Sequence, residues 1–294
     1  MSINLATHYA QSYSTIVELL LQRKGSILRE KVDFKGGYVG KQASPVDQIG
    51  AVEARRVTSK FGPMGRVDAP TDRRWVFPVD YDLPQLVDHF DKLRLLTDPE
   101  SSLVQNGQMA MGRAEDNEIR DAFFADAKTG EQGGTTTSFP AANQVAVNFE
   151  SASNVSLTVA KMREVRRLAK SKFLDWNNEQ MYIAISSKED SNLLKEIEII
   201  NLDYNDRPVL RDGRIERFLG MQFVDFEALN VDGSAFNRVP VWAKSGLHLA
   251  QWESFQTSVT KRNDLQGEPW QAYILGTLGA TRTQENKVYE IKCA

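Results

Sequence analysis

The spacing of apolar residues along the chain predicts three amphipathic helices. The first covers residues 7–25, where one stripe at helical spacing holds Tyr9, Tyr13, Ile16, Val17, Leu20 and Leu21. The second begins at Asp98, a residue type that caps helices, and continues to about Lys128. Its roughly 30 residues, rising 1.5 Å each, would form a rod of about 45 Å that spans the molecule. The third covers residues 157–173, and its inward face holds Met162, Val165, Leu168, Ala169 and Phe173.

Alternating apolar and polar residues predict a long hairpin and, later, a region rich in strands. Residues 51–58 and 73–81 have strand character, and the segment between them is rich in Gly, Pro and Asp, which is typical of a turn. A short helix is expected at residues 188–195. Further strands are expected at Gln144–Phe149, Met181–Ser186, Ile215–Phe226, Arg238–Ala250, Phe255–Lys261, Ala272–Ala280 and Lys287–Lys292. No repeat or low-complexity linker divides the chain, so we expect two intertwined subdomains.

The segment before the hairpin has a different character. Residues 32–49 contain Gly36, Gly37, Gly40 and Pro45 and show little periodicity, which predicts an extended arm. An arm with few apolar anchors is stabilised poorly by its own domain. We therefore expect it to pack against neighbouring molecules.

The predicted hairpin is rich in basic residues. Its flanks hold Arg55, Arg56, Lys60, Arg66, Arg73 and Arg74. One interpretation is a solvated edge that charge protects from unwanted strand pairing. The other is a charged finger that lies on a neighbouring subunit, and the sequence leaves both open.

Composition excludes several classes of protein. Of the 294 residues, 41% are apolar and 26% are charged, which is typical of a globular domain. No apolar run approaches the roughly 18 to 20 residues of a membrane-spanning helix, and residues 1–13 do not resemble a secretory signal. The 36 basic and 39 acidic residues give a net charge of −3, without the basic surplus of a dedicated nucleic-acid binder.

Motifs for catalysis or ligand binding are weak. The segment at residues 36–41, GGYVGK, has one residue too few for a phosphate-binding loop, and Gln42 stands where Ser or Thr would bind magnesium. The two carboxylates of residues 80–82, DYD, face one side of a strand but have no companion cluster. The histidines lack zinc-like spacing with the single cysteine, Cys293: they are His8, His89 and His248. We predict no catalytic, cofactor-binding or metal-binding residues.

The third predicted helix has a basic outer face. It holds Lys161, Arg163, Arg166, Arg167, Lys170 and Lys172. A solvated helix face explains this pattern, and any contact with DNA there would be independent of sequence.

The order of these elements resembles the major capsid proteins of tailed phages, which share the Johnson fold of the Hong Kong 97 type. Residues 22–32 (QRKGSILREKV) are similar to the arm that begins many of these proteins. Residues 73–130 are similar to the stretch that leads through the long spine helix, and residues 181–229 to the peripheral-to-axial region. That last region includes a turn at residues 212–213 and a strand of the form FLG-x-x-F at residues 218–223. The resemblance covers nearly the whole chain.

The resemblance implies an α+β fold with an N-terminal arm, an extended hairpin loop, a spine helix in a peripheral domain and a mixed α/β axial domain. The expected divisions are 1–48 for the N-terminal helix and arm, 49–82 for the hairpin loop, 83–143 with 226–294 for the peripheral domain, and 144–225 for the axial domain. It implies a shell-forming protein rather than an enzyme. The expected subunit-contact residues are Arg55, Arg56, Lys60, Arg66, Arg73, Arg74 and Trp75.

The resemblance also implies partners. The chain is expected to bind itself in pentamers and hexamers, and to assemble in the host cytoplasm into a virion capsid that meets packaged DNA only weakly and binds no membrane. A separate scaffolding protein, a portal and decoration proteins are the other expected partners, and no cofactor is expected. Some members of the family crosslink lysine to asparagine between subunits, and Lys60 would be the donor here, but a lysine on a loop is common and the sequence favours no crosslink. Two alternatives stay open: an encapsulin-like compartment with the same fold, and an α/β enzyme with an unrecognised site.

Overall fold

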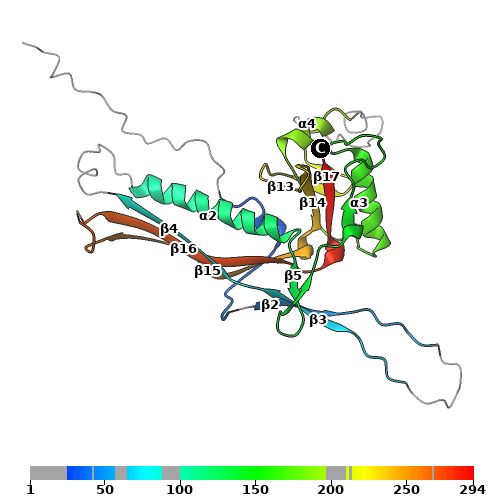
Figure 1. Cartoon of the computed structure of the whole chain (residues 1–294), viewed down its shortest axis with the longest axis horizontal. Helices are drawn as coiled ribbons and strands as arrows, with labels where there is room; N and C mark the ends of the chain where they lie inside the picture. Colours follow the sequence, from blue (N-terminus) through cyan, green and yellow to red (C-terminus); the bar gives the residue numbers. More distant parts are fainter. Residues whose placement is uncertain are drawn as a thin grey trace, which may run out of the picture.

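The computed structural model describes residues 25–41, 43–56, 65–87, 100–196, 210–211, 214–266 and 268–294. Figure 1 shows a compact region built on one sheet, a long narrow sheet that extends away from it, and a hairpin that projects beside it. Three α-helices lie in the described residues: α2 (Glu100–Ala122), α3 (Val159–Ser171) and α4 (Ser187–Leu193). Short 3-10 turns lie at Arg29–Lys31, Ala141–Asn143, Lys244–Gly246 and Glu285–Lys287. This mixture of helices and separate sheets confirms the predicted α+β class.

The compact region is a seven-stranded sheet with helices on both faces. Its strands, in spatial order, are β11 (Arg217–Phe218), β12 (Met221–Asp225), β8 (Met181–Ile185), β14 (Asn237–Ala243), β17 (Val288–Cys293) and β7 (Gln144–Val145), and β13 (Asn230–Val231) pairs with β14. Helix α3 packs on one face, against an apolar core that includes Met162, Ile183 and Tyr289. The end of α2 covers the other face, where Phe123 and Trp242 lie in a second core. Both faces of the sheet are therefore covered by helices and shielded from solvent, and the unbroken apolar run MYIAI of β8 is buried at every position.

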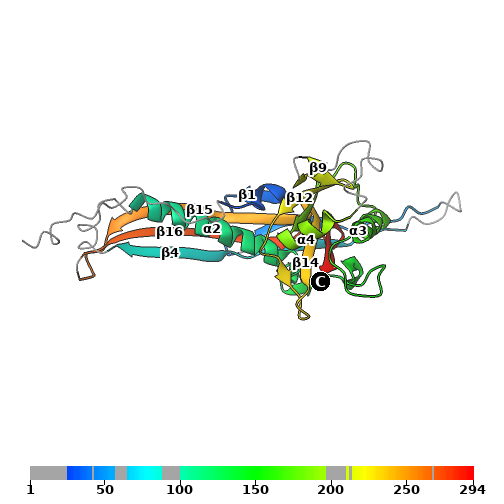
Figure 2. The ribbon, with the colours of Figure 1, turned by 90° about the horizontal axis from the view of Figure 1, so that it is seen from above.

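The long sheet has four strands and carries α2 on one face. Its order is β1 (Asp33–Gly36), β15 (Leu247–Lys261), β16 (Trp270–Arg282) and β4 (Val79–Val87). Figure 2, seen from above, shows α2 lying along these strands. A side chain at Gly107 of α2 would place its Cβ 2.4 Å from Ile274 Cδ1 and 3.3 Å from Leu83, so glycine lets the helix lie this close to the sheet without displacing the Ile274 side chain. Strands β15 and β16 continue from the compact region into the long sheet and connect the two.

A third sheet forms the base of the hairpin, in the order β2 (Ala43–Ile49), β3 (Thr71–Val76), β5 (Ala127–Thr129) and β6 (Thr135–Thr137). Two further strands, β9 (Leu210–Arg211) and β10 (Arg214–Ile215), pair with each other. The predicted hairpin strand at residues 51–58 is wrong over 51–56, which form no strand, while 57 and 58 lie outside the described residues. The strand lies earlier because Ala43 and the following residues pair with β3. The second predicted strand is two strands, β3 and β4, which belong to different sheets.

Helix α2 is shorter than its pattern predicts. It ends at Ala122 rather than Lys128, and its 23 residues span about 35 Å; the predicted cap at Asp98 lies outside the described residues. The end is fixed by the buried guanidinium of Arg282, which donates to the carbonyls of Phe123 at 3.0 Å and Ala125 at 2.8 Å. A cation there satisfies carbonyls that have no partner within the helix and complements the helix dipole.

The described residues that lead into the arm, 25–32, are anchored on their own chain, while contact of residues 32–49 with neighbouring molecules stays a prediction. Leu28 and Val32 are buried in the second core. The Asp116 carboxylate of α2 accepts hydrogen bonds from the Ser26 hydroxyl at 2.6 Å and from the backbone N–H of Leu28 at 2.9 Å. Two long-range anchors therefore stabilise this turn inside its own subunit. The helix predicted at residues 7–25 lies outside the described residues except for its last residue.

Helix α3 follows its predicted pattern, with two corrections. Met162, Val165 and Ala169 are buried, as the pattern predicts. Phe173, predicted to point inward, is 96% exposed, because the helix ends at Ser171 and Phe173 has a φ of 61°. Lys161, assigned to the basic outer face, is fully buried, and its ammonium donates to two backbone carbonyls, those of Val155 and Lys292.

Other predicted strands are shorter or divided. The strand predicted at residues 144–149 contains only the two residues of β7, and residues 215–226 form the short strands β10, β11 and β12. The strand predicted at residues 238–250 is interrupted by a 3-10 turn between β14 and β15. Over the part of the chain that the structure describes, no helix is both long and apolar enough to cross a membrane.

Candidate subunit-contact site

A buried arginine fixes the base of the hairpin. Arg74 of β3 is 3% exposed, and its Nε donates to the Thr283 carbonyl at 3.0 Å. One terminal nitrogen also donates to the Glu285 carboxylate at 2.7 Å. Both partners lie in the turn between β16 and β17, so this contact ties the hairpin to the junction of the other two sheets.

The residues on either side of Arg74 in the predicted contact set complete the base. Trp75 donates its indole N–H to the Gly130 carbonyl at 2.7 Å, which ties β3 to the loop after β5. Arg73 bonds to Asp47 of β2 at 2.6 Å and lies 5.6 Å from the Trp75 ring centre. The hydrogen bond and charge of Asp47 raise the pKa of Arg73 above its usual value. The structure therefore brings these three predicted residues together.

The outer hairpin residues have a different environment. Arg55, Arg56 and Arg66 are exposed and lie on the two arms of the hairpin, where Arg66 pairs with nearby Asp68 at 2.5 Å. Lys60 lies outside the described residues. Apolar side chains are exposed on the same arms, at 75% for Ile49, 55% for Val52 and 50% for Val67. Exposed apolar groups interspersed with exposed arginines form a surface suited to another macromolecule.

The weak binding motifs have structural partners in the fold. Residues 36–41 are followed by strand β2, not by the helix that a phosphate-binding loop would precede. The hydroxyl of Tyr38, within these residues, lies 3.0 Å from His248 Nε2. The other ring nitrogen of His248 lies 2.9 Å from the Asp33 carboxylate, and burial lowers the pKa of this histidine. The imidazole therefore connects β15 to the arm on two sides.

The acidic pair on β4 and the single cysteine are also part of the framework. Asp80 accepts a hydrogen bond from the Thr277 hydroxyl at 2.6 Å, and Asp82 one from the Tyr273 hydroxyl at 3.5 Å. Within the described ranges, no three His, Cys, Asp or Glu side chains are placed to hold a metal ion. Cys293 is buried, and burial raises the pKa of its thiol to about 12, which makes its thiolate scarce.

The exposed part of the α3 face still carries charge. Arg167 bonds to Glu164 at 2.6 Å, and Arg163 lies 3.8 Å from Glu150. Lys170, the residue before the last of the helix, is exposed. The hydrogen bond from Arg167 lowers the pKa of Glu164, so this pair stays ionised.

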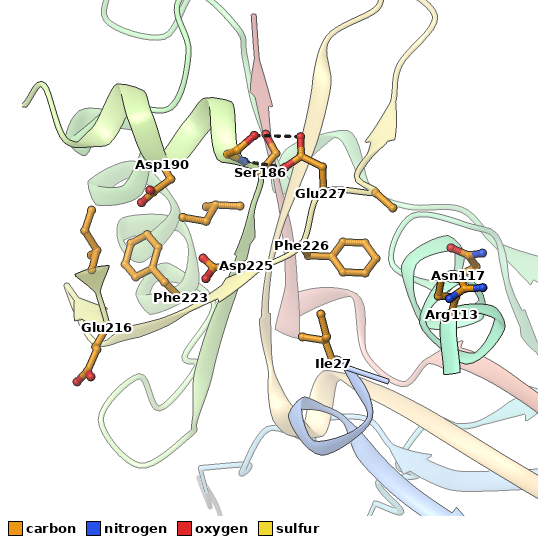
Figure 3. A pocket seen from close by; sticks show the side chains of 14 residues that line it. Ile27, Arg113, Asn117, Ser186, Asp190, Glu216, Phe223, Asp225, Phe226 and Glu227 are labelled. Atoms are coloured by element: carbon orange, nitrogen blue, oxygen red, sulfur yellow. Dashed lines mark hydrogen bonds between the residues drawn. The ribbon is translucent and has the colours of Figure 1, made fainter. Parts of the chain in front are cut away.

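A cavity of about 850 Å³, which no pattern in the sequence indicates, lies beside β12. Figure 3 shows Asp190, Asp225 and Glu216 on one side of it and Ile27, Arg113, Asn117 and Phe226 on the other. Desolvation, and then the charge of Asp225, raise the pKa of Asp190. These residues come from the arm, α2, α4 and β12, and no motif along the chain brings them together.

Several solved capsid structures superpose on nearly the whole chain. The capsid of cyanophage Pam1 superposes with a TM-score of 0.78 and 13% identity, covering 100% of this chain and 98% of that one. The capsid of cyanophage P-SCSP1u gives 0.72 and 13%, covering 100% and 95%. The capsid of Ralstonia phage GP4 gives 0.70 and 9%, covering 97% and 95%. At these identities the likeness shows a shared fold.

The sequence itself shows the family. No curated protein sequence matches the chain. The family described as phage capsid protein matches residues 5–294, which is nearly the whole chain and includes all four sheets of the described residues. This chain therefore belongs to the phage capsid protein family.

Proposed function

We propose that this chain is the major capsid protein that assembles, as many identical copies, into an icosahedral shell around a double-stranded DNA genome. The family match over residues 5–294 is the observation that carries the proposal. The shared fold with phage capsids and the elongated form of the subunit support it (Figure 1). The same match favours a phage capsid over an encapsulin-like compartment or an enzyme.

The hairpin supplies the contacts that we propose between subunits. Arg55, Arg56, Lys60 and Arg66 would contact the neighbouring copy, together with exposed apolar groups such as Ile49. Residues 73–75 would act from the base, because Arg74 is buried and Trp75 and Arg73 hold β3 against its neighbours. The contact therefore combines a charged outer surface with a base held by hydrogen bonds.

We propose that the chain divides as the family does. The N-terminal helix and arm would be 1–48 and the hairpin loop 49–82. The peripheral domain with α2 as its spine helix would take 83–143 and 226–294, and the axial domain 144–225. In this division β7, β8, β11 and β12 of the seven-stranded sheet belong to the axial domain and β13, β14 and β17 to the peripheral domain, so the two domains share that sheet.

Pentamers and hexamers of the chain would form the shell. Each ring closes because one surface of a copy binds a different surface of the next. Individual contacts can be weak, since a closed shell makes all of them at once.

The remaining partners follow from this role. A separate scaffolding protein would guide assembly in the host cytoplasm, a portal would occupy one vertex, and decoration proteins would bind outside. The net charge of −3 favours weak, non-specific contact with packaged DNA. No catalytic step is proposed.

Expression of the chain with the head genes of its own genome tests this function. We expect closed particles of uniform size in negative-stain electron microscopy of the fraction that sediments fastest. A variant with the hairpin tip shortened is the matched control and should stay in small oligomers. Wild-type chain that remains monomeric or dimeric with all head genes present would contradict the proposed function.

A further inference from the structure

The cavity beside β12 has apolar walls and an acidic rim. Its walls include Phe223 and Phe226, and Figure 3 shows Asp190 and Asp225 projecting near the Phe223 ring. The Asp225 side chain is exposed and accepts no hydrogen bond and forms no ion pair among the described residues. Its negative charge, together with that of Glu216 on the same rim, is therefore available to a ligand from outside.

A protruding aromatic side chain with basic neighbours lies at the end of α3. Phe173 is 96% exposed, although aromatic rings of this size are usually at least half covered. Its position is set by the helix end, where its N–H donates to the Lys170 carbonyl at 3.1 Å and the next N–H, of Leu174, donates to Ala169 at 3.1 Å. Lys170 is exposed one turn earlier and supplies the positive charge beside the ring, since the charge of Arg167 on the same side of the helix is balanced by Glu164. This group is an apolar knob with a positive border.

The knob and the cavity lie at opposite sides of the compact region. Strands β8 and β14 separate β12, at the cavity, from β17 and β7, against which α3 packs. The cavity lies at the β12 edge of the sheet, because its lining includes Ile185 and Ile215 of the core under α3 and Phe226 of the core under α2. Figures 1 and 2 both place α2 and α3 on opposite sides of this region. One subunit cannot fill its own cavity with its own knob, but a second copy can.

We propose that Phe173 of one copy inserts into the cavity of the next, with Lys170 beside the carboxylates of Asp225 and Glu216. The occupant is a second copy of this chain, because knob and cavity match in apolar character and are opposite in charge. Since the two surfaces differ, each copy inserts its Phe173 into one neighbour and accepts the Phe173 of another, and this head-to-tail arrangement can close a ring. The inference rests on the proposed shell function and names the contact that would hold a ring together.

Charge reversal tests the pairing in the expression system in which wild-type chain forms shells. Lys170→Glu places acid against acid, and Asp225→Lys places base against base. We expect each to lower the assembled fraction by about tenfold or more, because like charges opposed across an interface are strongly unfavourable. Lys170→Glu and Asp225→Lys in one chain exchange the two charges at every contact and should restore shells.

A mixture of the two single variants gives a sharper result. Like copies repel, but alternating copies place opposite charges together at every contact. An equal mixture should therefore form rings with an even number of subunits, such as hexamers, and no pentamers. Only a head-to-tail contact through these two residues predicts that the mixture recovers assembly in rings with an even number of subunits alone. Electron microscopy of the isolated rings measures the number of subunits in each.

Phe173→Ser tests the knob, with Val231→Ser as the matched control because Val231 is 57% exposed on β13 and does not line the cavity. We expect about a tenfold loss of assembly for Phe173→Ser and no loss for the control, since buried aromatic anchors dominate interfaces. Thermal unfolding should be unchanged for both, which separates assembly from folding. Shells from Lys170→Glu and Asp225→Lys at wild-type yield, or failure of both the double variant and the mixture to recover, would overturn the pairing. A wild-type chain that forms no shells would instead contradict the proposed function on which the pairing rests.

Discussion

The compact region and the hairpin differ in where their side chains find partners. In the seven-stranded sheet, Trp242 and Tyr289 are fully buried between helices of the same chain. In the hairpin arms, residues 51–56 and 65–70 are exposed throughout. The compact region has the buried core that a domain needs in order to fold alone. The hairpin arms have the exposed apolar and charged side chains of an interface whose partner is another molecule. A shell subunit needs both, and each should respond differently to substitution.

The largest loss of stability is expected at the centre of the compact region. Trp242 packs 4.6 Å from the Phe123 ring centre and donates its indole N–H to the Lys31 carbonyl at 2.9 Å. Trp242→Ala should lower the free energy of unfolding by about 3 to 5 kcal/mol, since it leaves a cavity and an unpaired carbonyl. Urea unfolding followed by circular dichroism measures this. Val67→Ala in the hairpin is the control, and an equal loss there would remove the difference between the regions.

Substitution at the hairpin base should give an intermediate loss. Arg74→Ala removes hydrogen bonds to Thr283 and Glu285 and leaves that carboxylate without its closest cation. We expect about 2 kcal/mol less unfolding free energy, the usual magnitude for hydrogen bonds to charged groups. Arg73→Ala, at the next position but on an exposed pair, is the control and should cost less. Equal losses of unfolding free energy for the two variants would mean that the burial of Arg74 does not strengthen its contacts at the hairpin base.

The anchor of the arm should respond to pH. Glu115 of α2 is 3% exposed, and its pKa is raised to about 6, mainly by burial, with Asp116 adding to the shift and Arg29 opposing it. The folded state therefore holds this proton more tightly than the unfolded state, and its contribution to stability falls as pH rises from about 4.5 to 6.

Glu115→Gln should remove that dependence. We expect the variant to match wild type near pH 4.5 and to exceed it by up to about 2 kcal/mol in unfolding free energy at pH 7. The loss of the Arg29 ion pair, at 3.6 Å, reduces the gain. Unfolding curves at both pH values measure the difference. A gain that shrinks with rising pH would show that the Glu115 pKa is not raised.

The smallest effect on stability is expected in the hairpin arms. Ile49→Ser and Val52→Ser change side chains that are 75% and 55% exposed. The free energy of unfolding should stay within about 0.5 kcal/mol of wild type, as for surface substitutions in general. The fraction assembled into shells should nevertheless fall, as sedimentation velocity can measure. Unchanged assembly would indicate that these arms do not contact another copy.

The sequence predicts the compact region better than the rest, for a physical reason. A strand buried on both faces needs an unbroken apolar run, and MYIAI identifies β8 at its observed position. The hairpin strands lack such a run, because β2 and β3 meet solvent, so their bounds are misplaced. Tertiary contacts also decide the end of α2, where Arg282 comes from a strand 160 residues later in the chain.

Individual side chains show where periodicity fails. Lys161 has the sequence pattern of a surface cation, but carbonyls of Val155 and Lys292 make its burial favourable. Phe173 has the pattern of an inward residue, but the chain turns before the helix reaches it. The cavity rim joins Asp190, Glu216 and Asp225, which only the fold brings together. A pattern of residue types does not contain these long-range partners.

Electron cryomicroscopy of particles formed by the wild-type chain tests most directly whether the exposed hairpin is an interface completed by another copy. We predict closed shells in which Arg55, Arg56 and the apolar side chain of Ile49 lie against a neighbouring subunit, while the compact region keeps the two cores described above. Shells in which these hairpin residues remain in solvent, or a chain that stays monomeric with all head genes present, would contradict this prediction.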